Sequence, residues 1–396
     1  MRDSCCLILI LFLCFPGCTA KKNEGFQKII GTVKIDSLYV IDLDIDEEQL
    51  IAYSSIFTKV ETIILETSRE SLIGNNYKFS VFENNIYILN LSNPKDFLVF
   101  DRQGKFLRKI GGIGGGPGEY TPRVFDFTFD PDNHIIYLLC DRVVNKYSTD
   151  GKFLGHISLS RHVPFIQFSN GKLYLAPQGN AYLLEEMDIE TGDTKFYLKA
   201  EQYSKGWTES SWTLQGSPFR NQSSESAKFA HMFMDTLVTM QPDGIVPFLV
   251  IKSKHLIDKE DLQKFAQMGP EGRGLEMRKT IRKIFCIHKY FEAKNKICFS
   301  YLNGMGIYSV LLDTLSNSYR KGFLSNDLVF DRRDRTMFGH FFSDAEGVYE
   351  MFPSILKEDF MKLIKEGKLS PDLDKRAQLM ELPEDANPVI FYYPNE

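Results

Sequence analysis

The stretch FLVFDRQGKFLRKIGGIGGGPGEYTPRVFDFTFDPDNHIIYLLCD, residues 97–141, decides the fold of this chain. It contains short runs rich in Phe, Ile, Leu and Val, and the runs are separated by Gly, Asp, Asn and Pro. Runs of this kind, bounded by turn residues, are typical of β-strands joined by tight turns. The stretch therefore predicts the end of one small β-sheet, a glycine-rich connection and the start of a second small β-sheet.

The glycine-rich connection, Gly111–Tyr120, lacks the pattern of a nucleotide-binding loop. A Walker loop requires a lysine after its last glycine, whereas Gly118 is followed by Glu119. A dinucleotide fingerprint that starts at Gly112 meets Pro117 where its third glycine belongs. We therefore expect the connection to turn the chain between two sheets. Its central residues, which we interpret as a structural loop, are Gly116, Pro117, Gly118 and Glu119.

The same strand–turn–strand pattern recurs along the chain at a period of roughly 40 to 50 residues, which is typical of propeller blades. An isolated sheet of this size cannot bury both of its faces, whereas sheets packed around an axis can. The sequence therefore predicts an all-β fold, a six-bladed β-propeller. Three of the units start with the hairpins Phe79–Asn90, Phe127–Asp141 and Ile166–Ala176, and the three later, degenerate units are Phe229–Ile251, His288–Gly322 and Phe338–Phe352.

The propeller is expected to occupy residues 33–396. The segments Val33–Ile45 and Asn387–Pro394 are both strand-like and could share the last blade. Residues 257–285 and 353–382 carry Leu, Phe and Met at helical intervals, so we expect helical insertions there. Such insertions either shape a binding surface or only decorate the ring.

The N-terminus has the pattern of an export signal. Residues 1–17 contain Arg2 and an apolar run that is too short to span a bilayer. The run ends in FPGC and resembles a bacterial lipobox, although Phe15 and Pro16 depart from the usual pattern. We therefore expect a lipoprotein signal peptide, a lipidated Cys18 and a linker over residues 18–32. The alternative is an ordinary secretory peptide with an incidental cysteine.

Composition excludes some classes of partner. The formal net charge of −5 is mild for 396 residues, and no basic stripe stands out, so we expect no nucleic-acid partner. We expect a monomer in the cell envelope that is held at the membrane by its lipid. The sequence does not decide between the periplasmic face and the cell surface. Beyond Cys18 the cysteines are Cys140, Cys286 and Cys298, for which buried free thiols or one Cys286–Cys298 disulfide are the two interpretations.

The chain resembles the lipid-anchored six-bladed β-propellers of Bacteroidota, whose blades are related to the NHL repeat. The resemblance rests on FDRQGKFLRKIGGIGGGPGEY (residues 100–120), VETIILETSRESLIGN (residues 60–75) and EDANPVIFYYP (residues 384–394). Its most specific element is the Gly-Pro-Gly-Glu motif at Gly116–Glu119, placed between two blades. The resemblance implies an envelope propeller whose termini close the ring together.

Histidines near the start of the last three units form one candidate site. His231, His288 and His340 are expected on the innermost strands, where they would hold calcium or zinc. However, His231 and His340 each precede a phenylalanine by two residues, whereas His288 precedes Phe291 by three. Side chains alternate along a strand, so the three cannot all face the same way, and inter-blade packing is the alternative.

Two functions remain. The leading hypothesis is a non-catalytic binding or scaffold propeller for a glycan, peptide or protein, with no cofactor. Trp207 and Trp212 would stack on sugars if their loop faces the channel, or would fill the interface between blades. The alternative is a metal-dependent hydrolase or lyase of the NHL-like type, with its site in the central channel.

Overall fold

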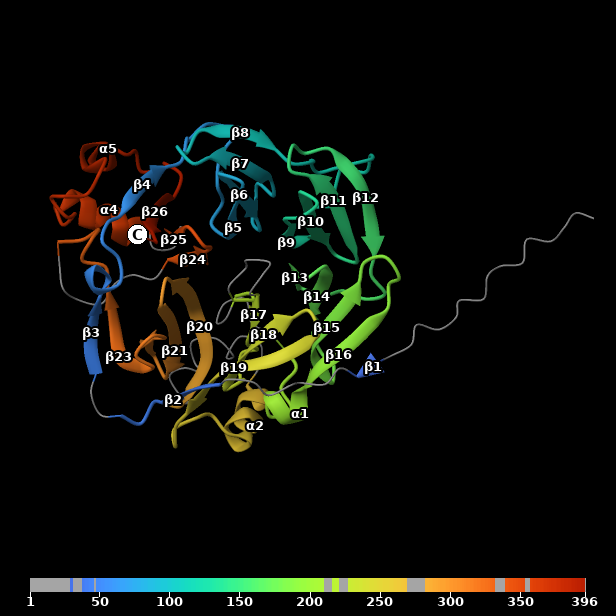
Figure 1. The fold of residues 1–396 in the computed structure, drawn as a ribbon. Coiled ribbons are helices and arrows are strands. Elements are labelled where there is room, and N and C mark those ends of the chain that lie inside the picture. The colour runs from blue at the N-terminus through green and yellow to red at the C-terminus, as the bar shows by residue number, and fades with distance from the viewer. Residues whose placement is uncertain are drawn as a thin grey trace, which may run out of the picture.

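The computed structural model describes residues 29–30, 38–45, 48–209, 216–220, 227–268, 282–331, 339–352 and 357–395. Its strands form six small sheets arranged in a ring around one axis (Figure 1). We call these sheets blades 1 to 6, in the sequence order of their own strands. The prediction of an all-β, six-bladed β-propeller is confirmed, and the six repeat units of the sequence correspond to the six blades.

Blades 1 to 3 are each built from one continuous segment of four antiparallel strands, which run outward from the axis. Blade 1 comprises β5 (Tyr77–Phe82), β6 (Asn85–Asn90), β7 (Phe97–Asp101) and β8 (Phe106–Lys109). Blade 2 comprises β9 (Val124–Asp130), β10 (Ile135–Cys140), β11 (Val143–Ser148) and β12 (Phe153–Ser158). Blade 3 comprises β13 (Phe165–Ser169), β14 (Lys172–Ala176), β15 (Tyr182–Asp188) and β16 (Thr194–Lys199), and the short helix α1 (Ala200–Tyr203) follows it.

Blades 4 and 6 have only three strands of their own, whereas blade 5 has four. Blade 4 comprises β17 (Lys228–Phe229), β18 (Thr236–Gln241) and β19 (Gly244–Lys252). Blade 5 comprises β20 (Ile284–Ala293), β21 (Lys296–Asn303), β22 (Gly306–Asp313) and β23 (Ser318–Ser325). Blade 6 comprises β24 (His340–Ser343), β25 (Gly347–Met351) and β26 (Val389–Pro394).

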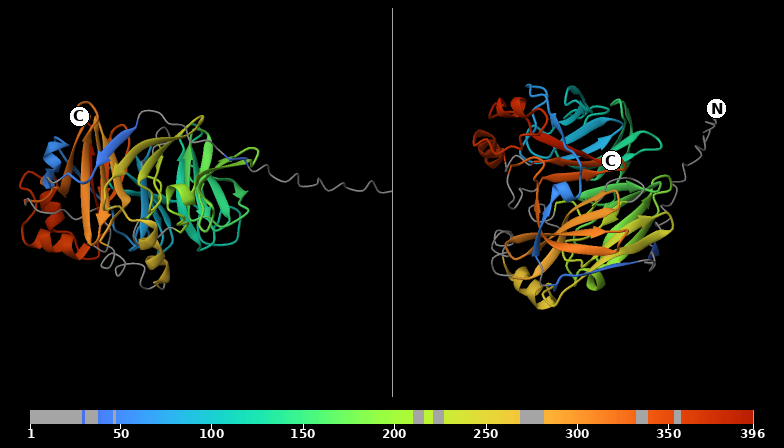
Figure 2. Two further views of the ribbon diagram at one scale, coloured as in Figure 1. Left: turned by 90° about the horizontal axis from the view of Figure 1, so that it is seen from below. Right: turned by 60° about the vertical axis from the view of Figure 1, so that its left-hand side comes forward.

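Four strands near the N-terminus run around the outside of the ring, and we call them the N-terminal belt (Figures 1 and 2). The first three add to blades 3, 4 and 5 as parallel outer strands, and the fourth completes blade 6 as an antiparallel strand. An added strand covers backbone groups that an outer edge would otherwise expose. The belt comprises β1 (Ile29–Ile30), β2 (Tyr39–Asp42), β3 (Glu48–Ala52), which continues into the 3-10 turn Tyr53–Ser55, and β4 (Glu61–Ile64).

The ring closes through N- and C-terminal strands, but the N-terminal partner differs from the expected one. β26 pairs with β4, and Ile390 lies opposite Ile63. The segment Val33–Ile45 was expected in this role, but its strand β2 pairs with β19 of blade 4. Both segments are strand-like, and the hydrophobic pattern does not encode which blade an added strand will join.

Helices lie in both predicted insertions. The first contains α2 (Lys259–Gln267), which begins with a capping box between Asp258 and Asp261. The second contains α4 (Lys357–Lys365) and α5 (Arg376–Met380), between β25 and β26. Buried residues of α4 and α5 pack into the interface between blades 5 and 6, so these helices are part of the core.

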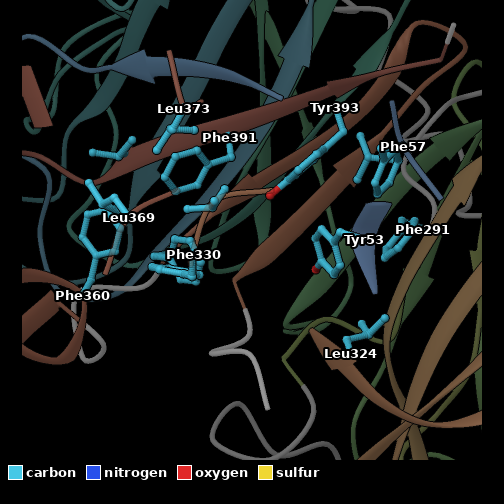
Figure 3. Packing of buried hydrophobic residues seen from close by; sticks show 14 of the residues in the cluster. Tyr53, Phe57, Phe291, Leu324, Phe330, Phe360, Leu369, Leu373, Phe391 and Tyr393 are labelled. Carbon is cyan, nitrogen blue, oxygen red and sulfur yellow. The ribbon is translucent and has the colours of Figure 1, made fainter. Parts of the chain in front are cut away.

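Packing between blades forms the core. The middle strands are buried almost throughout, whereas the outer strand β12 alternates between half-buried and exposed residues. Middle strands contact a blade on each face, so both faces must be apolar. Each of the six interfaces between neighbouring blades holds its own hydrophobic cluster. Figure 3 shows the interface of blades 5 and 6, where Tyr53 and Phe57 lie beside Tyr393, while Phe391 lies near Leu373.

Polar side chains on the innermost strands connect the blades near the axis. Lys78 of blade 1 forms an ion pair with Asp126 of blade 2, whose Oδ2 accepts the Ile166 amide of blade 3 at 3.0 Å. Lys228 of blade 4 pairs with Glu292 of blade 5 at 2.6 Å. These bonds fix the relative position of blades that are otherwise joined by apolar contacts.

All three cysteines of the described residues are buried and free, including Cys286 and Cys298, so the two are not bridged. Burial raises the pKa of the Cys140 thiol to about 12, and the thiol therefore stays protonated and unreactive.

Replacement of Asp126 tests the role of the inner polar bonds. Asp126→Ala leaves the Lys78 ammonium without its counter-ion, with only the Phe127 carbonyl at 2.7 Å still accepting from it, and leaves the Ile166 amide without its acceptor. Breaking a buried ion pair costs about 3–5 kcal/mol. We expect the free energy of unfolding, measured by chemical denaturation, to fall by about that amount. Asp132→Ala, at an exposed position of the same blade, is the control and should change it little. Equal effects of the two substitutions would contradict this role.

Candidate functional site

Basic side chains gather at the axis on blades 4, 5 and 6. Arg220, His231, Lys289 and His340 lie on or beside the innermost strands of these blades, and we call them the axial basic cluster. The four residues act on one another electrostatically: the charge of Arg220 lowers the pKa of His231 and of Lys289, and Lys289 lowers that of His340. Basic residues of three blades therefore lie close enough for their charges to act on one another.

Arg220 reaches the axis because an extra segment lies inside blade 4. Phe219 bridges Phe229 of β17 on the edge opposite β18, so this segment occupies the position nearest the axis. The Arg220 side chain is 9% exposed and donates to the carbonyls of Ser217 at 2.6 Å and Ala230 at 3.4 Å. Burial lowers its pKa to about 10, so it remains charged at neutral pH. Within the described residues, no acid forms an ion pair with it.

His231 is buried without a hydrogen-bond partner. Its side chain is 1% exposed, and neither Nδ1 nor Nε2 forms a hydrogen bond in the described part of the chain. Burial, together with the nearby charge of Arg220, lowers its pKa to about 4, so the ring is neutral at pH 7. A neutral imidazole has one donor and one acceptor nitrogen. Buried polar groups normally find partners, so this ring has unused hydrogen-bonding capacity.

Two bulges in β20 determine where Lys289 points. The register shifts once at Cys286, whose φ is +59°, and again between Ile287 and Tyr290, where His288 and Lys289 together oppose Ser300. The second bulge is held by the Lys289 amide, which donates to Ser300 Oγ at 3.0 Å. Bulges redirect side chains and are frequent beside active sites, and a positive φ at a residue other than glycine is strained. The strand that carries Lys289 is therefore irregular at two places next to the lysine.

The environment of Lys289 is unfavourable for a charge. Burial and the charge of Arg220 lower its pKa to about 8, which leaves it mostly protonated at pH 7. No acid among the residues that the structure describes forms an ion pair with its ammonium. The cluster therefore contains two cations without a counter-charge in contact.

Blade 6 contributes a solvent-reached histidine and a buried acid. His340, the first residue of β24, is exposed although it lies on an innermost strand, and its ring packs on Tyr77. Glu350 of β25 is fully buried and accepts hydrogen bonds from the Gly339 amide at 3.1 Å and from Tyr393 Oη at 3.2 Å. Burial raises the pKa of Glu350 to about 7. The cluster thus has solvent access on one side and a titrating acid on the other.

The three predicted histidines do not form a metal site together. His231 and His340 belong to the axial basic cluster, and His288 lies in the second bulge of β20. Among the described residues, no group of three or more His, Cys, Asp or Glu side chains is placed to hold a metal ion. The cluster instead has basic groups and few acids, which suits an anion better than a cation.

Trp207 packs against the helical insertion. Its ring contacts Phe233 at 5.5 Å and Phe265 of α2 at 4.8 Å between centroids, and its Nε1 donates to the Glu209 carbonyl at 2.8 Å. Sugar stacking by this ring stays a prediction. Trp212, Cys18 and the predicted signal peptide, residues 1–17, lie outside the described residues.

The Gly-Pro-Gly-Glu loop connects blade 1 to blade 2. Glu119 Oε2 accepts the Gly116 amide at 2.7 Å, which closes the loop on itself. Gly118 has a φ of +79°, and a Cβ there would lie 2.9 Å from the Cβ of Phe153, so the position requires glycine. The Gly118 carbonyl accepts Tyr147 Oη at 3.2 Å. The loop thus fastens itself to the outer strands of blade 2.

These features define the class of the protein as a six-bladed β-propeller with a basic site at its axis. The chain belongs to the family described as "Domain of unknown function (DUF4934)", whose family model matches residues 38–394. A search of curated proteins finds no match. Among the described residues, no helix has the length and apolar character that a membrane span needs.

Solved structures share the fold. A "putative exported protein" from Bacteroides fragilis is similar with a TM-score of 0.68 and 17% identity, over 91% of this chain and 100% of that chain. An extracellular domain from B. thetaiotaomicron is similar with a TM-score of 0.40 and 13% identity, over 72% of this chain and 34% of that chain. At these identities the likeness concerns the fold alone.

The raised pKa of Glu350 makes stability depend on pH. The folded state keeps a proton on this carboxyl up to about pH 7, whereas the unfolded chain releases it near its usual value of 4.5. The unfolded state therefore binds fewer protons between these values, and stability falls as pH rises through this window. Glu350→Gln removes the contribution of this titration to the free energy of unfolding. The difference in free energy of unfolding, variant minus wild type, should therefore be larger at pH 8 than at pH 5 by about 1–3 kcal/mol.

Chemical denaturation at several pH values measures this difference. Glu70→Gln, at an exposed position, is the matched control and should give a difference that does not vary with pH. A constant difference for Glu350→Gln as well would show that Glu350 titrates normally in the folded protein.

Proposed function

We propose that the protein is an exported, lipid-anchored propeller of the cell envelope that binds a ligand at the axial basic cluster without transforming it. The observation that carries the proposal is the set of buried polar groups without partners: both ring nitrogens of His231 and the Nε of Arg220. A buried polar group without a hydrogen bond reduces the stability of the folded protein by about 1–3 kcal/mol. Such a loss of stability is retained at sites where a ligand forms the missing hydrogen bond.

Further features support the proposal. His340 is exposed to solvent, and the bulges of β20 place Lys289 in the cluster at the expense of backbone regularity. A solved structure that shares this fold over most of the chain is described as that of a "putative exported protein". A glycan, a peptide or a protein segment would each offer hydrogen-bonding groups to the cluster, and fold alone does not choose among them.

An array experiment tests the binding function. Full-length protein, extracted in detergent, is applied to glycan and peptide arrays beside the variants His231→Phe and His255→Phe. We expect a defined set of ligands that the wild type and His255→Phe bind, because His255 is exposed and distant in sequence from the cluster. His231→Phe removes both unpartnered nitrogens and should bind at least about tenfold more weakly.

Two results would contradict the proposal. Equal binding by all three proteins would place the ligand elsewhere, and stoichiometric calcium or zinc that is lost in His231→Phe would favour a metal-dependent hydrolase or lyase instead. Circular dichroism of each variant establishes that the loss does not come from unfolding.

Replacement of Cys18 tests the anchor. The protein is expressed with its own leader in a Bacteroides host, and cells are separated into membrane and soluble fractions. We expect the wild type in the membrane fraction and Cys18→Ala in the soluble envelope fraction, because the lipidated cysteine would be the membrane attachment. Cys140→Ala is the control and should remain with the membrane. An unchanged distribution of Cys18→Ala would contradict lipid anchoring.

A further inference from the structure

Among the described residues, no acid forms an ion pair with the two cations of the axial basic cluster, Arg220 and Lys289. Arg220 is buried, and two of its N–H groups donate to backbone carbonyls. Carbonyl groups are uncharged and therefore do not neutralise the guanidinium. Lys289 lies near enough to Arg220 for the two charges to repel each other. Elsewhere near the axis, the described residues pair their cations with acids, as Lys78 does with Asp126 and Lys228 with Glu292. The cluster on blades 4 to 6 therefore differs from the structural ion pairs.

We propose that the axial basic cluster binds an oxyanion, a carboxylate or phosphate group of the ligand, which supplies the missing negative charge. This inference rests on the proposed binding function and specifies the chemical class of the ligand. Burial of an unpaired charge is expensive, and an opposite charge with good hydrogen bonds offsets that cost. An anion would thus provide the negative charge that Arg220 and Lys289 do not contact among the described residues.

The donors of the cluster suit an oxyanion. Arg220 has an Nε that makes no hydrogen bond, so part of its planar donor fork is available. His231 is neutral and offers one N–H, and the Arg220 guanidinium is close to it because it bonds to the carbonyl of Ala230, the preceding residue. Lys289 adds a point charge from blade 5. The three side chains could thus supply donors from two blades to one anionic group.

The charged and titratable groups around Lys289 set the pH dependence of binding. They are Arg220 of blade 4, Cys286 of blade 5, and Glu350 and His340 of blade 6. As pH rises, Glu350 becomes negative around a pKa of about 7, and Lys289 loses its charge around a pKa of about 8. Both changes make the site less positive, so anion binding should weaken from pH 6.5 to pH 9.

Calorimetry with simple anions tests the proposal. Full-length protein in detergent is titrated at pH 6.5 with inorganic phosphate, with glucuronate and with glucose, at constant ionic strength in chloride. Phosphate and glucuronate represent the two sources of an oxyanion, and glucose is the neutral analogue. We expect one or both anions to bind, glucose not to bind, and the anion affinity to fall at pH 9.

Substitutions at Lys289 locate the binding. Lys289→Met should weaken anion binding by about tenfold or more, because a charge-assisted hydrogen bond is worth about 1.5–3 kcal/mol. Lys289→Arg, which keeps the charge, should retain part of the affinity. Lys252→Met, the same substitution at an exposed position of blade 4, should bind like the wild type. Equal affinity of all four proteins, or no binding of either anion by the wild type, would overturn the proposal.

Thermal unfolding without added anion separates loss of the site from loss of the fold. Lys289 makes no ion pair among the described residues, so Lys289→Met should unfold at the same or a higher temperature than the wild type. A lower unfolding temperature would show that Lys289 is structural and would overturn the proposal. If the arrays identify a neutral ligand that depends on His231, the binding function stands and the anion class fails.

Discussion

The structure depends on one constraint: the middle strands of each blade are apolar on both faces, so no blade is stable alone. Strands such as β6 and β10 are buried along nearly their whole length because a neighbouring blade covers each face. Six hydrophobic clusters fill the six interfaces, and removal of any one would expose two blades. The ring must therefore close, and closure makes the pairing of β4 with β26 as important as any contact inside a blade.

Sequence reasoning found the local elements and missed the long-range pairings. Hairpins such as Phe79–Asn90 are encoded by neighbouring residues, and the three predicted hairpins form the inner strands of blades 1, 2 and 3. The closing strand was assigned to Val33–Ile45, because that segment and residues 61–64 are both strand-like and nothing local states which blade each joins. Partner choice depends on the full set of interfaces, which exists only in the folded ring.

The candidate site was partly visible in the sequence, although its chemistry was read differently. The sequence predicts His231, His288 and His340 as metal ligands, and two of them, His231 and His340, lie in the axial basic cluster. Their neighbours Arg220 and Lys289 belong to no sequence motif, because the surroundings of a cation depend on segments that are distant in the chain. One signal was present: His288 precedes Phe291 by three residues where the other units show two. The extra residue is the bulge at His288 and Lys289, which places the lysine in the site.

The N-terminal belt has a consequence for the order in which the protein can fold. Residues 29–64 leave the ribosome before their partners, which lie at residues 195–196, 249–252, 321–325 and 389–392. The belt therefore waits for strands made later in the chain, and each of its pairings requires closure of a long loop. Blades 1 and 2 can assemble from local hairpins while the belt is still unpaired. The ring can therefore close only after β26 has been synthesised, because a chain that stops before residue 389 has no strand with which β4 can pair.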